Sequence, residues 1–141
     1  MVVFTLASGT PSERLVIRQA LRDFALVSGR VVVARKNGPR SRRIVISDEA
    51  FGPAGHDSVG YHLKGKRSDL IALRPGLPPS TLYTVFIHEL GHYLGLEHRA
   101  EGIMAPRPET RSWGRLTRSL RRRVTTELTQ LLLASAIKRL E

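Results

Sequence analysis

The 141-residue chain contains no cysteine, which excludes disulfide bonds, thiolate metal sites, catalytic thiols and iron–sulfur clusters. Any metal must therefore be held by nitrogen and oxygen ligands. No stretch approaches the roughly 20 apolar residues that a membrane span needs, and residues 1–15 lack the basic start and long apolar run of a signal peptide. We expect a soluble chain, cytoplasmic unless a leader has been removed, although a cysteine-free protein suits reducing and oxidising compartments alike.

Acidic residues are also few, with 12 Asp and Glu against 23 Lys and Arg, so the formal net charge is +11. Such an excess attracts nucleic acid, anionic membrane surfaces or acidic substrates. It can equally reflect genome composition or solubility. The basic residues are not interleaved with aromatic residues that would stack on bases, which favours the second interpretation.

A length of 141 residues suits a single domain with one hydrophobic core. Hydrophobic patterns predict β-strands at residues 2–6, 30–34, 43–47, 59–63 and 69–73. The first should be buried at the centre of a sheet, and the fourth should be a short edge strand. The turn signal Asn37-Gly38-Pro39 lies between the second and third strands, which we expect to be neighbours.

Three helices are predicted between and after these strands. The first begins with a capping box formed by Thr10 and Glu13 and ends at Gly29. The second is capped by Ser80 or Thr81 and runs to about residue 95. The third runs from residue 116 to about residue 133, with leucine and valine residues on one stripe.

Residues 88–98 read HELGHYLGLEH, which matches H-E-x-x-H-x-x-G-x-x-H at every fixed position. His88 and His92 are one helical turn apart, so both imidazoles can reach one zinc ion at about 2.0–2.1 Å. Glu89 lies beside that face, where it can act on a water at the metal without ligating the metal. The pattern predicts a zinc site with an adjacent general base.

A helix continued past residue 94 would carry His98 away from the ion, so the chain must turn back. Gly95 permits this turn because glycine adopts positive φ at little steric cost. His98 then supplies the third ligand and leaves the fourth position open, as catalytic zinc requires. A lone HExxH can arise by chance, and a structural zinc site would close the fourth position. The longer pattern and the presence of Glu89 favour a catalytic site.

Met104 follows the third histidine within the segment GIMAP, residues 102–106. A single methionine is usually only a core residue. Its position shortly after His98 favours a hydrophobic floor beneath the metal, the feature called a Met-turn.

Through these residues the chain resembles the metzincin zinc peptidases, and among them the matrixins, whose zinc helix commonly reads HELGHxLGLxH before a Met-Xaa-Pro segment. The specific match covers residues 85–106, and residues 51–55 are similar to the glycine-rich loop before the family's substrate-binding strand. The resemblance implies an α+β fold: a twisted, mixed, mostly parallel sheet with two helices packed on it and a third, C-terminal helix after the Met-turn. One catalytic domain, residues 1–141, would then comprise an upper part (1–98) and a lower part (99–141).

The resemblance also implies a cleft along the sheet edge. Substrate would lie antiparallel to the edge strand near Val59, Gly60 and Tyr61. The wall of the pocket after the scissile bond would come from the segment that begins at Pro106 and ends at Trp113.

Several matrixin features are missing. Arg99 follows the third histidine, where matrixins usually have serine and other groups have an acidic residue. The ligands of the matrixin structural zinc are not recognisable, and we interpret His56 and His62 as ordinary polar residues. No calcium loop is apparent among the acidic candidates Asp48, Glu49, Asp57 and Asp69. We therefore expect one zinc ion, with neither structural zinc nor calcium.

The sequence thus predicts a matrixin-like zinc endopeptidase that hydrolyses peptide or protein substrates through a zinc-activated water, with Glu89 as general base. One alternative is a basic module that binds nucleic acid or an anionic surface. Another is an inactive metzincin scaffold for protein interaction, against which the intact Glu89 argues. An acidic partner could dock on arginines near and in the third helix, most of which we expect opposite its leucine stripe: Arg111, Arg115, Arg118, Arg121, Arg122 and Arg123.

Overall fold

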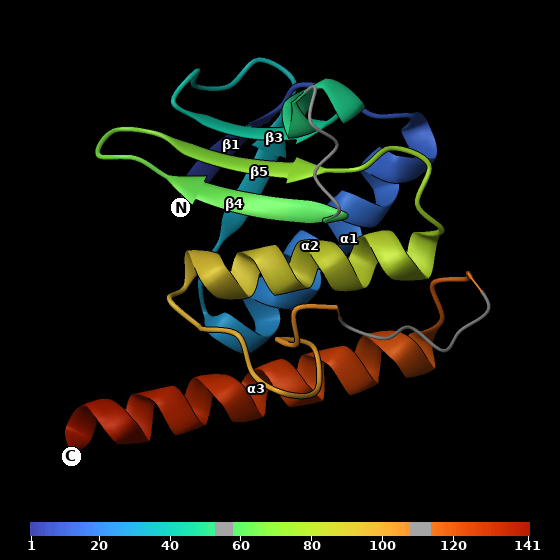
Figure 1. Ribbon diagram of the computed structural model, residues 1–141. Helices are drawn as coiled ribbons and strands as arrows, with labels where there is room; N and C mark the ends of the chain where they lie inside the picture. The colour runs from blue at the N-terminus through green and yellow to red at the C-terminus, as the bar shows by residue number, and fades with distance from the viewer. Residues whose placement is uncertain (53–57, 108–113) are drawn as a thin grey trace.

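Five short strands form one sheet, with helices on one of its faces (Figure 1). The structure, a computed structural model, describes residues 1–52, 58–107 and 114–141. In chain order the strands are β1 (Val2–Leu6), β2 (Val32–Arg35), β3 (Arg42–Ile46), β4 (Gly60–Lys64) and β5 (Asp69–Leu73). The helices are α1 (Pro11–Ser28), the short 3-10 helix η1 (Asp48–Phe51), α2 (Pro79–Tyr93) and α3 (Arg118–Leu140).

The strand order across the sheet is β2-β1-β3-β5-β4. The first four are mutually parallel, and β4 pairs antiparallel with β5 at the edge. Helices α1 and α2 pack on one face, and α3 lies beneath them on the side away from the sheet (Figure 1). The mixed, mostly parallel α+β architecture is therefore confirmed, as is the edge position of β4. The central strand is β3, and β1, expected at the centre, is an interior strand between β2 and β3.

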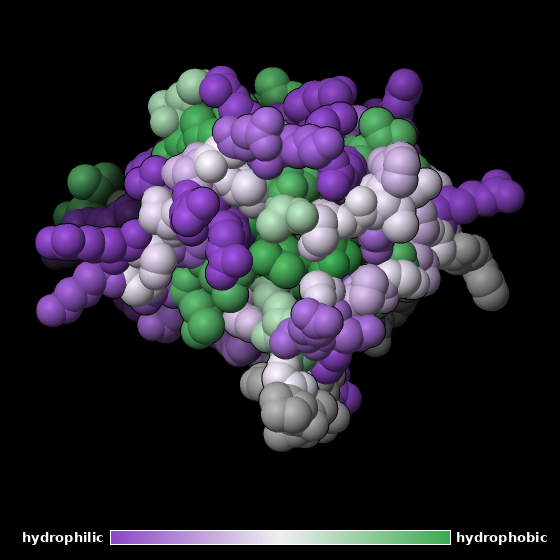
Figure 2. Space-filling view, turned by 90° about the horizontal axis from the view of Figure 1, so that it is seen from above, coloured by the Kyte–Doolittle hydropathy of each residue, from purple (hydrophilic) through white to green (hydrophobic). Residues whose placement is uncertain are grey.

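The opposite face of the sheet is seen in Figure 2. Hydrophobic side chains gather near the middle of this face, within a border of hydrophilic ones. Side chains of one strand alternate between the two faces, so Val45 and Leu70 point away from the helices while Ile44 and Ile71 are fully buried beneath the sheet.

The prediction that strands 30–34 and 43–47 are neighbours is wrong, because β1 lies between β2 and β3. The connecting loop crosses β1 instead of forming a hairpin. The hydroxyl of Thr5 donates a hydrogen bond of 2.7 Å to the carbonyl of Pro39. A Cβ at Gly38 would lie only 2.6 Å from that hydroxyl oxygen. The Asn37-Gly38-Pro39 signal thus marks a close crossing over a third strand, which local sequence does not distinguish from a hairpin.

Helix α1 begins and ends as predicted. The Thr10 hydroxyl accepts the Glu13 N–H at 3.1 Å, and the Glu13 carboxylate accepts the Thr10 N–H at 2.9 Å. Gly29 ends the helix with φ of 70°, in the left-handed region. These local signals need no tertiary partner, which explains why the sequence predicts them well.

The ends of the other two helices differ from the predictions. Pro78, not Ser80 or Thr81, is the N-cap of α2, and Pro79 occupies the first helical position, where a missing N–H costs nothing. Helix α2 ends at Tyr93. Helix α3 extends to Leu140, seven residues past the predicted end, since residues 134–140 contain neither glycine nor proline.

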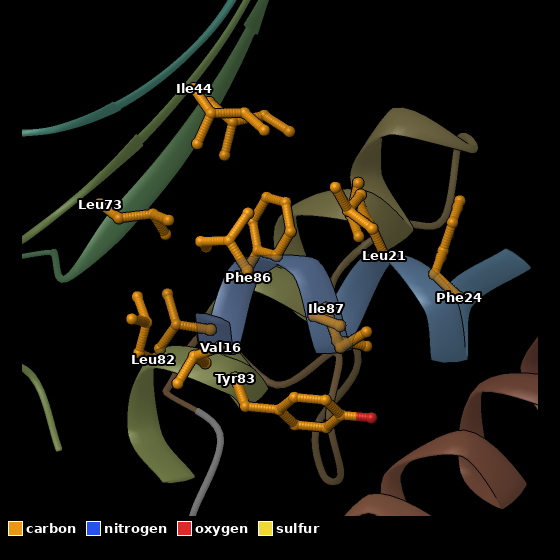
Figure 3. Packing of buried hydrophobic residues seen from close by; sticks show 14 of the residues in the cluster. Val16, Leu21, Phe24, Ile44, Leu73, Leu82, Tyr83, Phe86 and Ile87 are labelled. Carbon is orange, nitrogen blue, oxygen red and sulfur yellow. The ribbon is translucent and has the colours of Figure 1, made fainter. Parts of the chain in front are cut away.

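One buried cluster of apolar side chains joins the sheet to all three helices, and its residues come from both the 1–98 and the 99–141 segments. Figure 3 shows Ile44 and Leu73 of the sheet facing Leu82 and Phe86 of α2. From α3, the predicted stripe contributes three buried members to the cluster: Leu120, Val124 and Leu128.

A buried carboxylate ties the three helices together. Asp23 of α1 accepts two hydrogen bonds of 2.9 Å from the guanidinium of Arg121 and one of 2.6 Å from the hydroxyl of Tyr83. Arg121 is therefore not a free surface charge, which corrects its place in the predicted arginine cluster. Arg115, Arg118, Arg122 and Arg123 are exposed, whereas Arg111 lies outside the described residues.

The Asp23 pair predicts acid-sensitive stability. Burial alone raises the pKa of Asp23, but hydrogen bonds from Arg121, Tyr83 and Gln19 outweigh it and lower the pKa below its ordinary value. A lowered folded-state pKa stabilises the fold above the unfolded pKa, and this contribution is lost as the pH falls through the folded pKa. Asp23→Asn should therefore cost about 2 kcal/mol at neutral pH and less in acid. Urea unfolding followed by circular dichroism at both pH values checks this, and an equal loss at both would contradict it.

Candidate metal centre

Two histidines project from the same face of α2 near its C-terminal end. His88 and His92 are one turn apart, and their Nε2 atoms lie 3.0 Å from each other. Their rings meet nearly at right angles, with centroids 4.6 Å apart. The i, i+4 spacing alone sets this proximity, because both side chains lie over the same turn of the helix.

Backbone carbonyls fix the tautomer of both histidines. Nδ1 of His88 lies 2.7 Å from the carbonyl oxygen of Ile103, and Nδ1 of His92 lies 2.8 Å from that of Leu96. A carbonyl only accepts, so both Nδ1 atoms must carry the proton and donate it. The two Nε2 lone pairs then face each other. Two acceptors at 3.0 Å repel unless a cation lies near both, and two ligands of one tetrahedral zinc ion would be about 3.3 Å apart.

Burial favours the neutral form that metal ligation requires. It lowers the pKa of His88 to about 4 and lowers the pKa of His92 as well, although each backbone hydrogen bond acts in the opposite direction. At neutral pH both imidazoles therefore present a lone pair rather than a charge. This is the protonation state in which histidine binds a metal.

The turn that follows α2 brings the third histidine, His98, close to the other two. Gly95 has φ of 92°, and the N–H groups of Gly95 and Leu96 donate to the carbonyls of His92 and Gly91, both at 2.9 Å. The ring of His98 then lies 5.2 Å from that of His88 and 4.7 Å from that of His92, measured between centroids. The positive φ expected of Gly95 is confirmed.

The ligand nitrogens of these three histidines all lie within 4.8 Å of one another. Across the ranges that the structure describes, they form the only group of three or more potential ligand residues close enough to hold one metal ion. The three side chains predicted as ligands can therefore hold a metal ion together.

Gly95 offers a geometric test of the site. We expect Gly95→Val to disrupt the turn and weaken metal binding through His98, because a β-branched residue is strained at this positive φ. Apart from the two adjacent residues, no atom of the described chain lies within 4 Å of a Cβ built at Gly95, so backbone conformation, and not crowding, causes the effect. Gly95→Ala is the matched milder variant. Zinc content measured after dialysis checks this, and normal zinc in the valine variant would contradict it.

Glu89 lies beside the histidines in a buried position, with only 4% of its surface exposed. One carboxylate oxygen is 4.0 Å from Nε2 of His88, too far for a hydrogen bond. The other is buried and has no hydrogen-bond partner among the described residues. Burial raises the pKa of Glu89 to about 7, so this carboxyl group can gain or release a proton near neutral pH.

Met104 is fully buried and packs against α2 at Gly91, between His88 and His92. A Cβ at Gly91 would lie 2.6 Å from its sulfur, so only glycine lets the methionine approach α2 this closely. The N–H of Arg99 donates to the Met104 carbonyl at 2.9 Å. Met104 thus links the segment that carries His98 to α2.

A cavity of about 260 Å³ opens in front of these groups. It is lined by the three histidines of the triad and by Glu89. Four residues predicted for the substrate cleft also line it, together with His62: Val59, Gly60, Tyr61 and Pro106. Trp113 lies outside the described residues. A larger cavity of about 770 Å³ between residues 95–101 and α3 also includes His98, but neither Glu89 nor the other two histidines.

His62 has a more specific environment than the sequence suggested. Its Nε2 lies 2.9 Å from a carboxylate oxygen of Asp69, and its side chain is only 7% exposed. It lies opposite Ile71 on the helix-facing side of β4, where it borders the cavity. Strand alternation with Gly60 is the signal that could have placed it there.

The remaining candidate ligands are engaged elsewhere or lie apart. Asp48 pairs with Arg74 at 3.0 Å, and the side chain of Glu49 is exposed. Asp57 and His56 fall outside the described residues. Among the described residues, the candidate metal group consists of His88, His92 and His98 and includes no acidic residue.

Comparison with known proteins gives no match to a protein-family model and none to a curated protein. None of the described helices combines the length and apolar character needed to cross a membrane.

Proposed function

We propose that the chain is a zinc-dependent endopeptidase of the metzincin type, most similar to a minimal matrixin catalytic domain. The observation that carries the proposal is the convergence of three histidine nitrogens on one point beside a buried carboxylate that has an unpartnered oxygen. The HExxHxxGxxH pattern and the Met-turn support the same assignment.

Zinc is the metal that best suits the donor set. Three histidine ligands without thiolates, with a fourth position left open to a cavity, are typical of catalytic zinc. A bound zinc ion supplies a Lewis acid that activates water and polarises a carbonyl group.

The residues of the chain supply proton transfer and hold the metal ligands in place. Glu89 accepts a proton from the attacking water and passes it to the nitrogen of the leaving amine as the peptide bond breaks. Burial raises the pKa of Glu89 to about 7, and a nearby zinc ion would lower it again, which favours the carboxylate form that accepts a proton. The carbonyls of Ile103 and Leu96 hold the imidazoles of His88 and His92 in the ligating orientation.

Strand β4 offers a place for an extended substrate. It is the last strand in the sheet order of the described residues, the position at which an extended peptide can add to a sheet. Gly60 and Tyr61 on this strand line the same cavity as Glu89. A peptide paired to β4 would therefore pass beside the proposed general base.

Digestion of casein or gelatin tests the function directly. The purified chain should cleave protein, lose activity with a chelator and recover it when zinc is restored. Binding to nucleic acid or acidic vesicles without chelator-sensitive cleavage would favour the basic binding module. Zinc binding with no cleavage of any protein or peptide library would favour an inactive scaffold.

A further inference from the structure

One carboxylate of helix α3, that of Glu127, contacts the loop that supports His88. The side chain of Glu127 accepts the backbone N–H of Ile103 at 2.7 Å. A Cβ at Gly102 would lie 2.5 Å from one of its carboxylate oxygens and 2.9 Å from the other, so the carboxylate lies directly against the backbone of residues 102–103. Gly102 also has φ of 83°, which favours glycine there.

Ile103 is held at both of its backbone polar groups. Its N–H donates to Glu127, and its carbonyl accepts the Nδ1 proton of His88 at 2.7 Å. The carbonyl selects the tautomer of His88 that directs Nε2 toward the other two histidines. The position of Glu127 therefore affects the orientation of a metal-binding side chain through a single residue.

The segment between α2 and α3 needs such an anchor. Its described residues, 94–107 and 114–117, contain no helix or strand. Glu127, by contrast, lies on a regular helix next to Leu128, which is fully buried in the core. A hydrogen bond to a charged acceptor is stronger than one between neutral groups, so the carboxylate suits the task of holding a loop.

We propose that Glu127 is a positioning residue for the metal centre: it fixes Ile103, and Ile103 orients His88 for metal binding. The inference rests on the proposed zinc site but not on peptidase activity. It assigns to α3 a role in metal affinity, beyond its contribution to the hydrophobic core.

The test compares zinc affinity, measured by competition with a chelating dye, in four variants. Glu127→Ala should weaken zinc binding about tenfold or more, as is typical when a residue supporting a ligand is removed. Glu127→Gln keeps an acceptor oxygen at the same reach and should restore most of the affinity. Glu127→Asp is shorter by one methylene and should be weaker than the glutamine variant.

Arg121→Gln is the matched control on the same helix. It removes the bonds to Asp23, and so should lower the thermal midpoint without changing zinc affinity. The absorption bands of bound cobalt report ligand geometry and should shift in Glu127→Ala but not in Arg121→Gln. If the alanine variant does not fold, the aspartate and glutamine variants carry the comparison.

Three outcomes decide the matter. Weakened affinity in Glu127→Ala with rescue by glutamine supports the inference. Unchanged affinity in Glu127→Ala, or an equal loss in Arg121→Gln, overturns it while the zinc site stands. A parent protein that binds no zinc overturns the proposed function and this inference together.

Discussion

Glu89→Ala is expected to retain a full equivalent of zinc and to lose nearly all peptidase activity. Glu89 supplies no ligand nitrogen to the triad, so its removal leaves the three histidines in place. Among the described residues that line the cavity, it is the only carboxylate. Loss of a positioned general base typically costs roughly 10²–10⁴-fold in rate. Metal analysis beside a quenched fluorescent peptide assay measures both quantities on the same sample.

Two further variants make the result specific. Glu89→Gln keeps the size and one acceptor oxygen but cannot accept the proton, so it should be as inactive as the alanine variant. Glu49→Ala changes an exposed glutamate on η1 and should behave like the parent. Peptide cleavage by Glu89→Ala at the parental rate would show that the assigned mechanism is wrong even if the zinc site is right.

The elements of the fold were predictable where local chemistry decides them. The capping box of Thr10 and Glu13 and the left-handed Gly29 define α1 without help from the rest of the chain. Strand positions followed from short apolar segments, three of which are rich in β-branched residues: 2–6, 30–34 and 43–47. The order of strands was not predictable in the same way, because β1 separates β2 from β3 through contacts between residues 30 or more positions apart.

In the candidate site, too, the residues placed by local sequence were predictable and those placed by tertiary packing were not. Helical periodicity places His88, Glu89 and His92 together, and the glycine rule predicts the turn at Gly95. Glu127 lies 24 residues from the backbone N–H that it binds, within a helix whose sequence gives no sign of this contact. Its role depends on how α3 docks, which only the tertiary structure provides.

Arg121 shows that a cluster of arginines in the sequence need not be a cluster of exposed charges. In sequence it is one of three consecutive arginines, Arg121 to Arg123, and a helical projection places most of the cluster on a solvated face. In the structure it pairs with Asp23 and borders the core, while its two successors are exposed. An acidic partner could therefore use Arg122 and Arg123, but replacing all three arginines together would confound partner binding with stability.

His92→Ala is expected to lose zinc, activity and zinc-dependent stability together. The parent should gain about 2.7 kcal/mol when free zinc is 100 times its dissociation constant, since the metal binds only the folded chain. For a chain of this length that corresponds to a rise of roughly 8 °C in the thermal midpoint. The variant retains two of the three ligand nitrogens and should show almost no rise at the same zinc concentration.

His62→Gln is the control for this experiment because His62 borders the same cavity but lies outside the triad. It should bind one equivalent of zinc, and zinc should raise its thermal midpoint as it does for the parent. The comparison separates loss of a ligand from loss of any histidine near the site. If His92→Ala were stabilised by zinc as strongly as the parent, or if His62→Gln lost its zinc, the ligand set assigned to His88, His92 and His98 would be wrong.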